Sequence, residues 1–478
     1  MRERWLWLPV ALLPALILAP LAVLRFVDVD EGSYAAASAL ALDGVVPYRD
    51  FLYTQTPLLP YVYGAWAEVV GEHWLAIRAL SLAFGLVTAL LLTRHLFVRF
   101  GLRLAFLGSV LLATSTLAFT WYPPVKTYAL TTALVFGAYV LISRAEPGPR
   151  AWLAAGALAS FAVQTRALVV GAALAFAWES IRTGRGLLRY SIGFVVALAP
   201  TFIVFALDPR AFLFGNLGVH GVRSEGGLVG DFEQKGKVVA NLLGIATDAR
   251  PVTQYLLLGG AAAVAAIVAR RDRGRIPLWF LVAALLALVA LFPTPTYTQY
   301  FATTIPFLIV GVVELVRAAA DEPATSRTLL GAVAAIWLLA YLVFAPVEFA
   351  HIVRASPEGR PARVQEVSDF VDARTDAGEE VLASWPGYIF GTHARPVPGL
   401  ENDFGPHDAE HLTPAEAKRY HLITDEQVEE LIRQHRTRLV VVKLWHVLPP
   451  VPDYDGAARA AGYRLVTELN GARIYVAP

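Results

Sequence analysis

Long apolar stretches separated by short arginine-containing turns fill the first 355 residues of the chain. A helix that crosses a lipid bilayer needs about 20 consecutive apolar residues, because a rise of about 1.5 Å per residue must cover a hydrocarbon core of about 30 Å. Nine stretches approach this length: 5–25, 74–93, 103–120, 127–143, 187–207, 252–269, 276–292, 300–318 and 327–346. They predict an α-helical polytopic membrane protein. The first stretch is predicted to be a retained span rather than a signal peptide, because it is long and no small-residue cleavage site follows it.

The arginines predict how these spans are oriented, because Lys and Arg accumulate in short cytoplasmic loops. They occur in alternate connections: Arg2 and Arg4; Arg94, Arg99 and Arg103; Arg144 and Arg150; Arg182, Arg185 and Arg189; Arg270, Arg271, Arg273 and Arg275; Arg317 and Arg327. A further apolar region, 151–181, is interrupted by Gln164-Thr165-Arg166. It connects two basic loops, so it must form an even number of crossings: two short helices or a re-entrant pair. About eleven spans result, with a cytoplasmic N-terminus and external loops at 26–73 and 208–251.

The last 123 residues, 356–478, have a different composition from the membrane part, residues 1–355. Of residues 356–478, 32 are charged, about 26%, which is close to the value of about 25% for soluble proteins. Only 47 of the first 355 residues are charged. The segment is therefore predicted to be a small external α/β domain. Its expected strands are 379–385, 438–444, 463–469 and 472–477, and its expected helices are 424–437 and the region around 455–457.

Composition also excludes several kinds of function. The 40 basic residues are balanced by 39 acidic ones, which argues against binding to nucleic acid. The chain has no cysteine, so disulfides, iron–sulfur clusters and thiolate zinc sites are excluded. A cytosolic enzyme is excluded by the apolar first 355 residues.

Three carboxylates, Asp28, Asp30 and Glu31, lie within four residues at the outer end of the first span. We expect Asp30 to cap a helix over 31–44, with a second helix over 57–71. One interpretation is that the acids only cap this helix and face water; the other is that one carboxylate is a general base at the membrane surface. The two interpretations are compatible. The second external loop contains the glycine-rich segment 215–236, which is predicted to be mobile.

The motif Asp30-Glu31-x-x-Tyr34, followed by PYRDFLYTQTPLLPYVYG at 47–64, resembles the first external loop of GT-C membrane glycosyltransferases. It is most similar to the family 39-like branch, which contains protein O-mannosyltransferases and lipid A aminoarabinose transferases. The resemblance extends to WYPPVKTYALT at 121–131, QTR at 164–166 and YTQYFATTIPFL at 297–308. It also includes the external α/β domain at the end of the chain.

The resemblance implies that the protein transfers a single hexosyl or pentosyl unit from a polyprenyl-phosphate donor. The acceptor is a lipid, a glycan or a protein on the extracytoplasmic face of the cell membrane, and the anomeric centre is inverted. Asp30 matches the catalytic aspartate and is assigned as the base, Glu31 as an orienting acid and Asp28 as the alternative base. Because a phosphate leaves as a stabilised anion, such a site needs a base and cations more than an acid. Asp28, Asp30 and Glu31 offer oxygen ligands for a hard cation, but the resemblance favours neither metal nor cofactor.

The expected donor ligands depart from the family at one position. Relatives in the aminoarabinose branch have a lysine before the paired prolines, where this chain has Gln55 and Thr56. The donor or phosphate ligands are therefore predicted among Arg49, Lys126, Arg166, Arg223, Tyr34, Gln55, Gln299 and Tyr300. Simpler interpretations remain for the cations: Arg49 pairs with Asp43 or Asp50, Lys126 and Arg166 extend from apolar segments to water, and Arg223 is solvated in a flexible loop.

Two other classes of function remain open. A transporter or lipid flippase would need charged residues inside the membrane pathway and usually shows internal repeats; the spans are nearly free of charge, and no repeat is detected. A non-catalytic scaffold that presents the external domain needs no carboxylates at the membrane boundary. The loop at 384–406, with Trp385, Tyr388, His393 and Arg395, either contacts the acceptor or packs on the membrane part.

Overall fold

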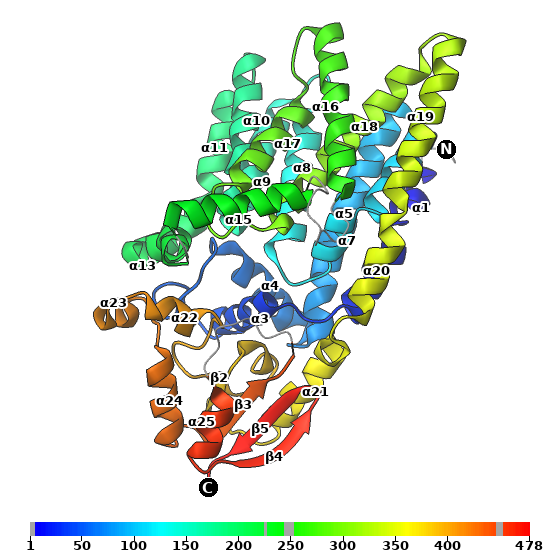
Figure 1. The fold of residues 1–478 in the computed structure, drawn as a ribbon. Helices are drawn as coiled ribbons and strands as arrows, with labels where there is room; N and C mark the ends of the chain where they lie inside the picture. The colour runs from blue at the N-terminus through cyan, green and yellow to red at the C-terminus, as the bar shows by residue number, and fades with distance from the viewer. Residues whose placement is uncertain (1–4, 224–226, 243–252, 446–452) are drawn as a thin grey trace.

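A computed structural model describes residues 5–223, 227–242, 253–445 and 453–478. A helical body and a small C-terminal sheet lie at opposite ends of the molecule, and two short helices, α3 (Val29–Leu42) and α4 (Leu58–Val70), lie between them (Figure 1). Arg2, Arg4 and residues 243–252 of the predicted loop and span lie outside the described ranges.

Each predicted apolar stretch is helical where it is described. The helices of the body are α1 (Trp7–Ala11), α2 (Ala15–Leu24), α5 (Trp74–Phe100), α6 (Leu102–Ala113), α7 (Thr116–Trp121), α8 (Thr127–Ile142), α9 (Pro149–Thr165), α10 (Val170–Arg182), α11 (Leu187–Ala197), α12 (Ala199–Leu207), α16 (Thr253–Arg273), α17 (Leu278–Ala290), α18 (Ile305–Ala320), α19 (Ala324–Leu342) and α20 (Phe344–Arg354). Four helical segments of the described chain are long and apolar enough to cross a membrane, and α11 with α12 forms a fifth that is bent by 42°. Three shorter apolar helices, α6, α8 and α17, accompany them. The protein is a multi-pass α-helical membrane protein; the number of eleven spans stays a prediction.

The interruption at Arg166 divides the apolar region 151–181 as predicted. Helix α9 ends at Thr165, a 3₁₀ turn (η2) covers Ala167–Val169, and α10 begins at Val170. Arg166 itself has extended backbone angles at the junction of the two helices.

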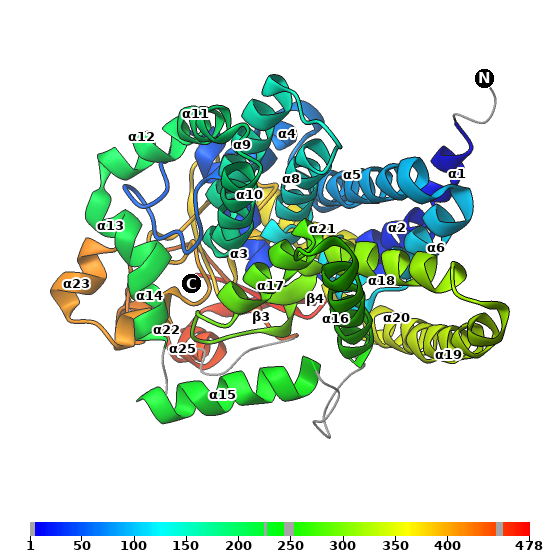
Figure 2. The ribbon, with the colours of Figure 1, turned by 90° about the horizontal axis from the view of Figure 1, so that it is seen from above.

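One local prediction in the loops is wrong. The N-cap of α3 is Asp28, not Asp30, because Asp28 and Glu31 form a capping box. The Asp28 side chain accepts from the backbone N–H of Asp30, and the Glu31 side chain accepts from the backbone N–H of Asp28. The described part of the glycine-rich segment and its flanks is helical, with α13 (Pro209–Leu213), a π-helix (η3, Phe214–Gly218), α14 (Val219–Val222) and α15 (Gly227–Leu242). The mobility of this segment stays a prediction, and residues 224–226 lie outside the described ranges. Packing overrides the low helix propensity of glycine here, since the Phe214 ring stacks on Tyr420 with centroids 3.8 Å apart. Helix α15 lies at the edge of the molecule (Figure 2).

The C-terminal part is an α/β unit with a five-stranded sheet in the order β2-β1-β3-β5-β4. Its strands are β1 (Glu380–Ala383), β2 (Arg395–Pro396), β3 (Leu439–Lys443), β4 (Arg464–Leu469) and β5 (Ala472–Val476). The first three are parallel neighbours, and β3-β5-β4 is antiparallel. Its helices are α21 (Pro361–Asp372), α22 (Gly405–Glu410), α23 (Pro414–Arg419), α24 (Asp425–Arg433) and α25 (Tyr454–Ala460), with 3₁₀ turns η5 (Pro357–Gly359) and η6 (Pro386–Tyr388). The four predicted strands are confirmed, and β2 was not predicted because only two residues pair.

One face of this sheet shares its hydrophobic core with the loop at 26–73 and the start of α5. Val381 and Trp385 belong to the same buried cluster as Tyr34 of α3 and Trp74 of α5. The Trp385 indole N–H donates to the carbonyl of Val29 at 2.8 Å, and its ring stacks on Trp74 with centroids 5.9 Å apart. Trp385 and Tyr388 thus pack on the membrane part, while His393 and Arg395 contact Asp372 and Asp43 near the surface.

Gly32 makes this contact possible, because a Cβ atom there would lie 2.3 Å from Nε1 of Trp385. Gly32→Ala is expected to destabilise the protein by about 1–3 kcal/mol through overpacking, although alanine alone would favour the helix by about 0.5–1 kcal/mol. The midpoint of thermal unfolding in detergent measures this. Gly331→Ala in α19 is the control, since nothing lies within 4 Å of that position. Equal midpoints for the two variants would contradict the expected clash.

Candidate active site

A cavity of about 190 Å³ lies where α3, the start of α8, the junction at Arg166 and the C-terminal part meet. Of the eleven residues predicted from sequence, nine line it: Asp28, Asp30, Tyr34, Gln55, Lys126, Arg166, Arg223, Gln299 and Tyr300. Gln299 and Tyr300 belong to the 3₁₀ helix η4 (Thr298–Thr304). Glu31 and Arg49 do not line it. Residues far apart in sequence thus share one polar cavity.

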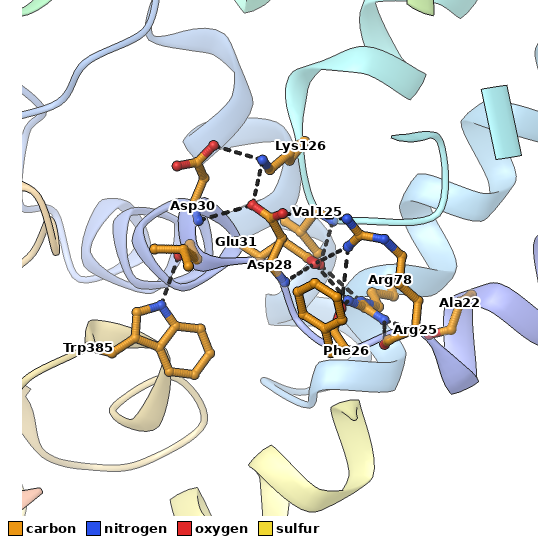
Figure 3. Close-up of polar contacts among 11 residues, drawn as sticks. Ala22, Arg25, Phe26, Asp28, Asp30, Glu31, Arg78, Val125, Lys126 and Trp385 are labelled. Carbon is orange, nitrogen blue, oxygen red and sulfur yellow. Dashed lines mark hydrogen bonds and ion pairs between the residues drawn. The ribbon is translucent and has the colours of Figure 1, made fainter. Parts of the chain in front are cut away.

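Lys126 joins the two aspartates of the cavity. Its Nζ atom lies 2.5 Å from Oδ1 of Asp28 and 2.7 Å from Oδ2 of Asp30 (Figure 3). The Lys126 side chain is buried, whereas 13% of Asp28 and 40% of Asp30 are exposed. Asp28 also caps α3 and lies 3.4 Å from Nη2 of Arg25. Asp30 is therefore the aspartate with the greater access to the cavity, and Asp28 is the one that holds the helix.

Glu31 faces the interior instead of the cavity and is completely buried. The Arg78 guanidinium donates to both its oxygens, Nε to Oε2 at 2.9 Å and Nη2 to Oε1 at 2.6 Å. The backbone N–H groups of Asp28 and Val125 also donate to Glu31, at 2.7 and 2.8 Å. A single carboxylate thereby fixes the start of α3 against the turn that precedes Lys126.

Arg78 completes this network with its remaining donors. Nη1 donates to the carbonyls of Ala22 and Arg25 at 3.1 and 2.8 Å, and Nη2 donates to that of Phe26 at 2.9 Å. Arg78 was not predicted, although it was visible as a charged residue inside the apolar stretch 74–93. A charge within a membrane-spanning segment is a functional candidate in itself.

Arg166 is the cation of the cavity that lacks an acidic partner. It is 4% exposed, and Nη1 donates to the Thr127 hydroxyl at 3.0 Å. Its guanidinium lies over the rings of Tyr128 and Tyr300, at 4.8 and 4.5 Å from their centroids. Among the described residues no carboxylate lies within ion-pair distance of it. Such an arginine, held in place by hydroxyl and aromatic contacts, keeps its charge for an anionic ligand.

The other two predicted cations have partners. Arg223 is not solvated, because it donates to both oxygens of the fully buried Asp408 at 2.8 and 2.6 Å. It therefore connects α14 to the C-terminal part while it lines the cavity. Arg49 forms two hydrogen bonds with Asp50 at 2.8 and 2.6 Å on the surface, the simpler of the interpretations that the sequence allowed.

The C-terminal part contributes one wall of the cavity through the loop 384–406, for which the sequence left contact with the acceptor and packing on the membrane part both open. Glu401, Asn402 and Phe404 line it, and Asp403 accepts a hydrogen bond from the Ser33 hydroxyl at 2.8 Å. Loss of contact with water raises the pKa of Glu401 to about 7. The same cause, together with the charge of Asp30, raises the pKa of Asp403 to about 7. The sequence indicated this loop but did not single out these residues within it, because they meet α3 only in the folded chain.

Three cations hold the acids of the first loop, and one of them, Arg25, lies 3.4 Å from Asp28 and 3.6 Å from Glu31. Glu31 is bound to Arg78, while Asp28 and Asp30 share Lys126. Over residues 5–223, 227–242, 253–445 and 453–478, no group of three or more His, Asp or Glu side chains is arranged to hold a metal ion. Metal independence stays a prediction.

No protein-family model and no curated protein matches the sequence. Solved structures do match the fold. ArnT from Cupriavidus metallidurans in the apo state has a TM-score of 0.67 at 13% identity, over 98% of this chain and 97% of that one. The same protein bound to undecaprenyl phosphate gives 0.64 at 15% identity, over the same shares. The archaeal oligosaccharyltransferase AglB from Archaeoglobus fulgidus, in complex with an inhibitory peptide and a dolichol-phosphate, gives 0.50 at 12% identity over 92% of this chain and 70% of that one.

Proposed function

From the GT-C fold, which this chain shares with ArnT and AglB, we propose that the protein is an integral membrane glycosyltransferase. It moves a single sugar from a polyprenyl-phosphate donor to an acceptor hydroxyl on the extracytoplasmic face. The observation that carries the proposal is the cavity in which a partly exposed carboxylate, Asp30, meets the buried, acid-free cation Arg166. The solved relatives, which hold undecaprenyl phosphate and dolichol-phosphate, support the class of donor.

The proposed reaction is one displacement at the anomeric carbon. Asp30 accepts the proton of the acceptor hydroxyl while that oxygen forms a bond to the anomeric carbon. The bond between this carbon and the phosphate oxygen breaks, and its electron pair leaves with the polyprenyl phosphate. A single displacement inverts the anomeric centre. The proton ends on Asp30, and the phosphate needs no proton to leave.

The cations act on the departing phosphate. The Arg166 guanidinium can make bidentate contact with phosphate oxygens, and Lys126 provides a second charge beside Asp30. Tyr34, Gln55, Gln299 and Tyr300 line the same cavity and are proposed to contact the sugar or the carrier. Gln55 provides a neutral hydrogen-bond donor and acceptor at a position where the aminoarabinose branch has a cation. Lys126 and Arg166 are therefore proposed to neutralise the donor phosphate in its place.

Transfer itself is the decisive measurement. The purified protein is reconstituted in liposomes with a labelled polyprenyl-phosphate sugar and a mixture of acceptors extracted from the cell envelope. We expect label to appear in an acceptor and free polyprenyl phosphate to accumulate. Movement of the lipid-linked sugar across the bilayer without transfer would instead indicate a flippase.

Arg166→Gln is expected to raise the KM for the donor by about 10- to 100-fold, because a charged hydrogen bond contributes about 1.5–3 kcal/mol. Donor titration in the liposome assay measures this. Arg419→Gln removes the same charge from a surface pair with Asp208 and is expected to leave KM unchanged. An unchanged KM for Arg166→Gln would contradict donor binding by Arg166 and indicate that this residue has only a structural role.

The proposed extracytoplasmic site requires the segment 356–478 to lie outside the cell membrane, as the arginine distribution predicts. Protease added to intact spheroplasts is expected to remove an epitope tag fused after Pro478. A tag on the N-terminus should be protected until lysis. Cleavage of the C-terminal tag only after lysis would reverse the orientation.

A further inference from the structure

A second and larger cavity, of about 960 Å³, lies at the end of the helical body farthest from the sheet, the upper end in Figure 1. It is formed by the ends of α5, α8 and α10 and the start of α17. Helix α8 connects the two cavities, with Tyr128 in the candidate active site and Ser143 here. At about 1.5 Å per residue these positions are about 22 Å apart. The second cavity is therefore separate from the proposed reaction.

Arginines dominate its lining, and we call it the arginine cavity. It is lined by Arg94, Arg99, Arg144, Arg182, Arg185 and Arg275, with two acids, Glu179 and Glu314. Arg182 pairs with Glu179 at 2.5 Å, and Arg99 lies 3.4 Å from the His95 ring nitrogen. In the described part of the chain, the other four arginines have no carboxylate within ion-pair distance. The described lining thus carries six arginines and two acids, a net excess of positive charge.

Membrane topology accounts for arginines in these loops but not for their gathering around one cavity. Arg103, Arg150 and Arg189 belong to the same loops and do not line it. Like charges around a concave, apolar-walled space repel one another and focus a positive potential there. An anion in the cavity relieves this repulsion, and guanidinium groups match phosphate oxygens in geometry as well as charge.

The cavity also has apolar walls that suit an amphiphile. Val98 and Ile276 line it with 70% and 50% of their side chains exposed. Trp152 and Trp279 line its inner part, and their indole N–H groups have no hydrogen-bond acceptor among the described residues. A small soluble anion would use only the arginines, whereas a lipid would use the charged and the apolar walls together.

We propose that the arginine cavity binds the phosphate-bearing headgroup of an anionic phospholipid in the cytoplasmic leaflet. Basic pockets between transmembrane helices on the cytoplasmic side have this role in other membrane proteins. The site is distinct from the donor site in position and in leaflet. It does not depend on the proposed transferase activity.

The test uses the full-length protein in detergent, titrated with phosphatidylglycerol, with phosphatidylcholine or with inorganic phosphate, and native mass spectrometry as the readout. Two triple variants remove equal charge from neighbouring positions: R94Q/R185Q/R275Q in the lining and R103Q/R150Q/R189Q outside it. We expect phosphatidylglycerol to bind the wild type and the outer variant alike. The lining variant is expected to bind it about 100-fold more weakly. A third variant, R94K/R185K/R275K, keeps the charge at the same three positions and is expected to weaken binding by less than the glutamine variant. Stronger binding by the lysine variant would show that the glutamine variant loses affinity through its lost charge and not through misfolding.

Three results would overturn the proposal. Equal weakening in the two glutamine variants would show a general effect of surface charge. Equal affinity for phosphatidylcholine would show that the anionic headgroup is not recognised. Displacement of phosphatidylglycerol by millimolar inorganic phosphate, with the same dependence on the lining arginines, would assign the cavity to a soluble phosphate compound.

Discussion

Replacing Asp30 by asparagine is expected to lower the rate of sugar transfer by about 10²- to 10⁴-fold, the usual contribution of a general base. An amide has the size of the carboxylate but does not accept the proton of the acceptor hydroxyl. The fold is expected to persist, because Asp30 is 40% exposed and its backbone N–H still donates to the Asp28 side chain. Single-turnover transfer in liposomes measures the rate, and thermal unfolding confirms that the variant is folded.

Asp28 and Asp43 provide the matched controls for this result. Asp28→Asn weakens the ion pairs with Lys126 and Arg25 at the start of α3, so its larger effect is expected on stability. Asp43→Asn lies at the other end of α3, in a surface pair with Arg395, and is expected to leave transfer unchanged. Full activity in Asp30→Asn, together with a 10²-fold or greater loss in a folded Asp28→Asn, would move the base to Asp28.

Glu31→Gln is expected to destabilise the protein by about 3–5 kcal/mol, because it takes the negative charge away from the buried Arg78 and from the buried Arg25 at 3.6 Å. The loss should exceed that of any surface pair. The surface control is Asp50→Asn, which weakens the contact with Arg49, where the two side chains are 45% (Arg49) and 31% (Asp50) exposed, and is expected to cost about 1 kcal/mol or less. The yield of monodisperse protein and the midpoint of thermal unfolding measure both.

A double-mutant cycle shows whether the pair acts as one unit. Arg78→Met alone leaves Glu31 charged and buried, whereas Glu31→Gln with Arg78→Met removes both charges. The double variant is expected to be more stable than the sum of the single losses predicts, by about 0.5–3 kcal/mol. Strict additivity would show that Glu31 and Arg78 are stabilised by their backbone partners rather than by each other.

The parts of this protein that could be predicted from sequence are those set by local composition. Apolar length predicts the helices of the body, and the interruption at Gln164-Thr165-Arg166 predicts the division between α9 and α10. Alternating apolar residues predict four strands of the sheet. The acids of the first loop indicated a candidate site, because three charges at a membrane boundary are energetically costly unless they are solvated or functional.

The parts that could not be predicted depend on contacts between distant segments. Arg223 meets Asp408 across 185 positions of sequence, and Ser33 meets Asp403 across 370. The helical state of the glycine-rich segment depends on packing such as that of Phe214 on Tyr420. Two misses had a local signal: the spacing of Asp28 and Glu31 fits a capping box, and Arg78 stands alone in an apolar stretch.

The shared core of α3 and the sheet has a consequence for biosynthesis. A ribosome completes the first loop early, yet Trp385, which covers Gly32, and Asp403, which binds Ser33, emerge more than 350 residues later. At about 5–20 residues per second, tens of seconds separate the two events. On the predicted orientation, the last 123 residues must also be translocated before they reach α3. Maturation of the cavity therefore waits for the end of the chain, and a prematurely terminated product would be inserted in the membrane without a complete site.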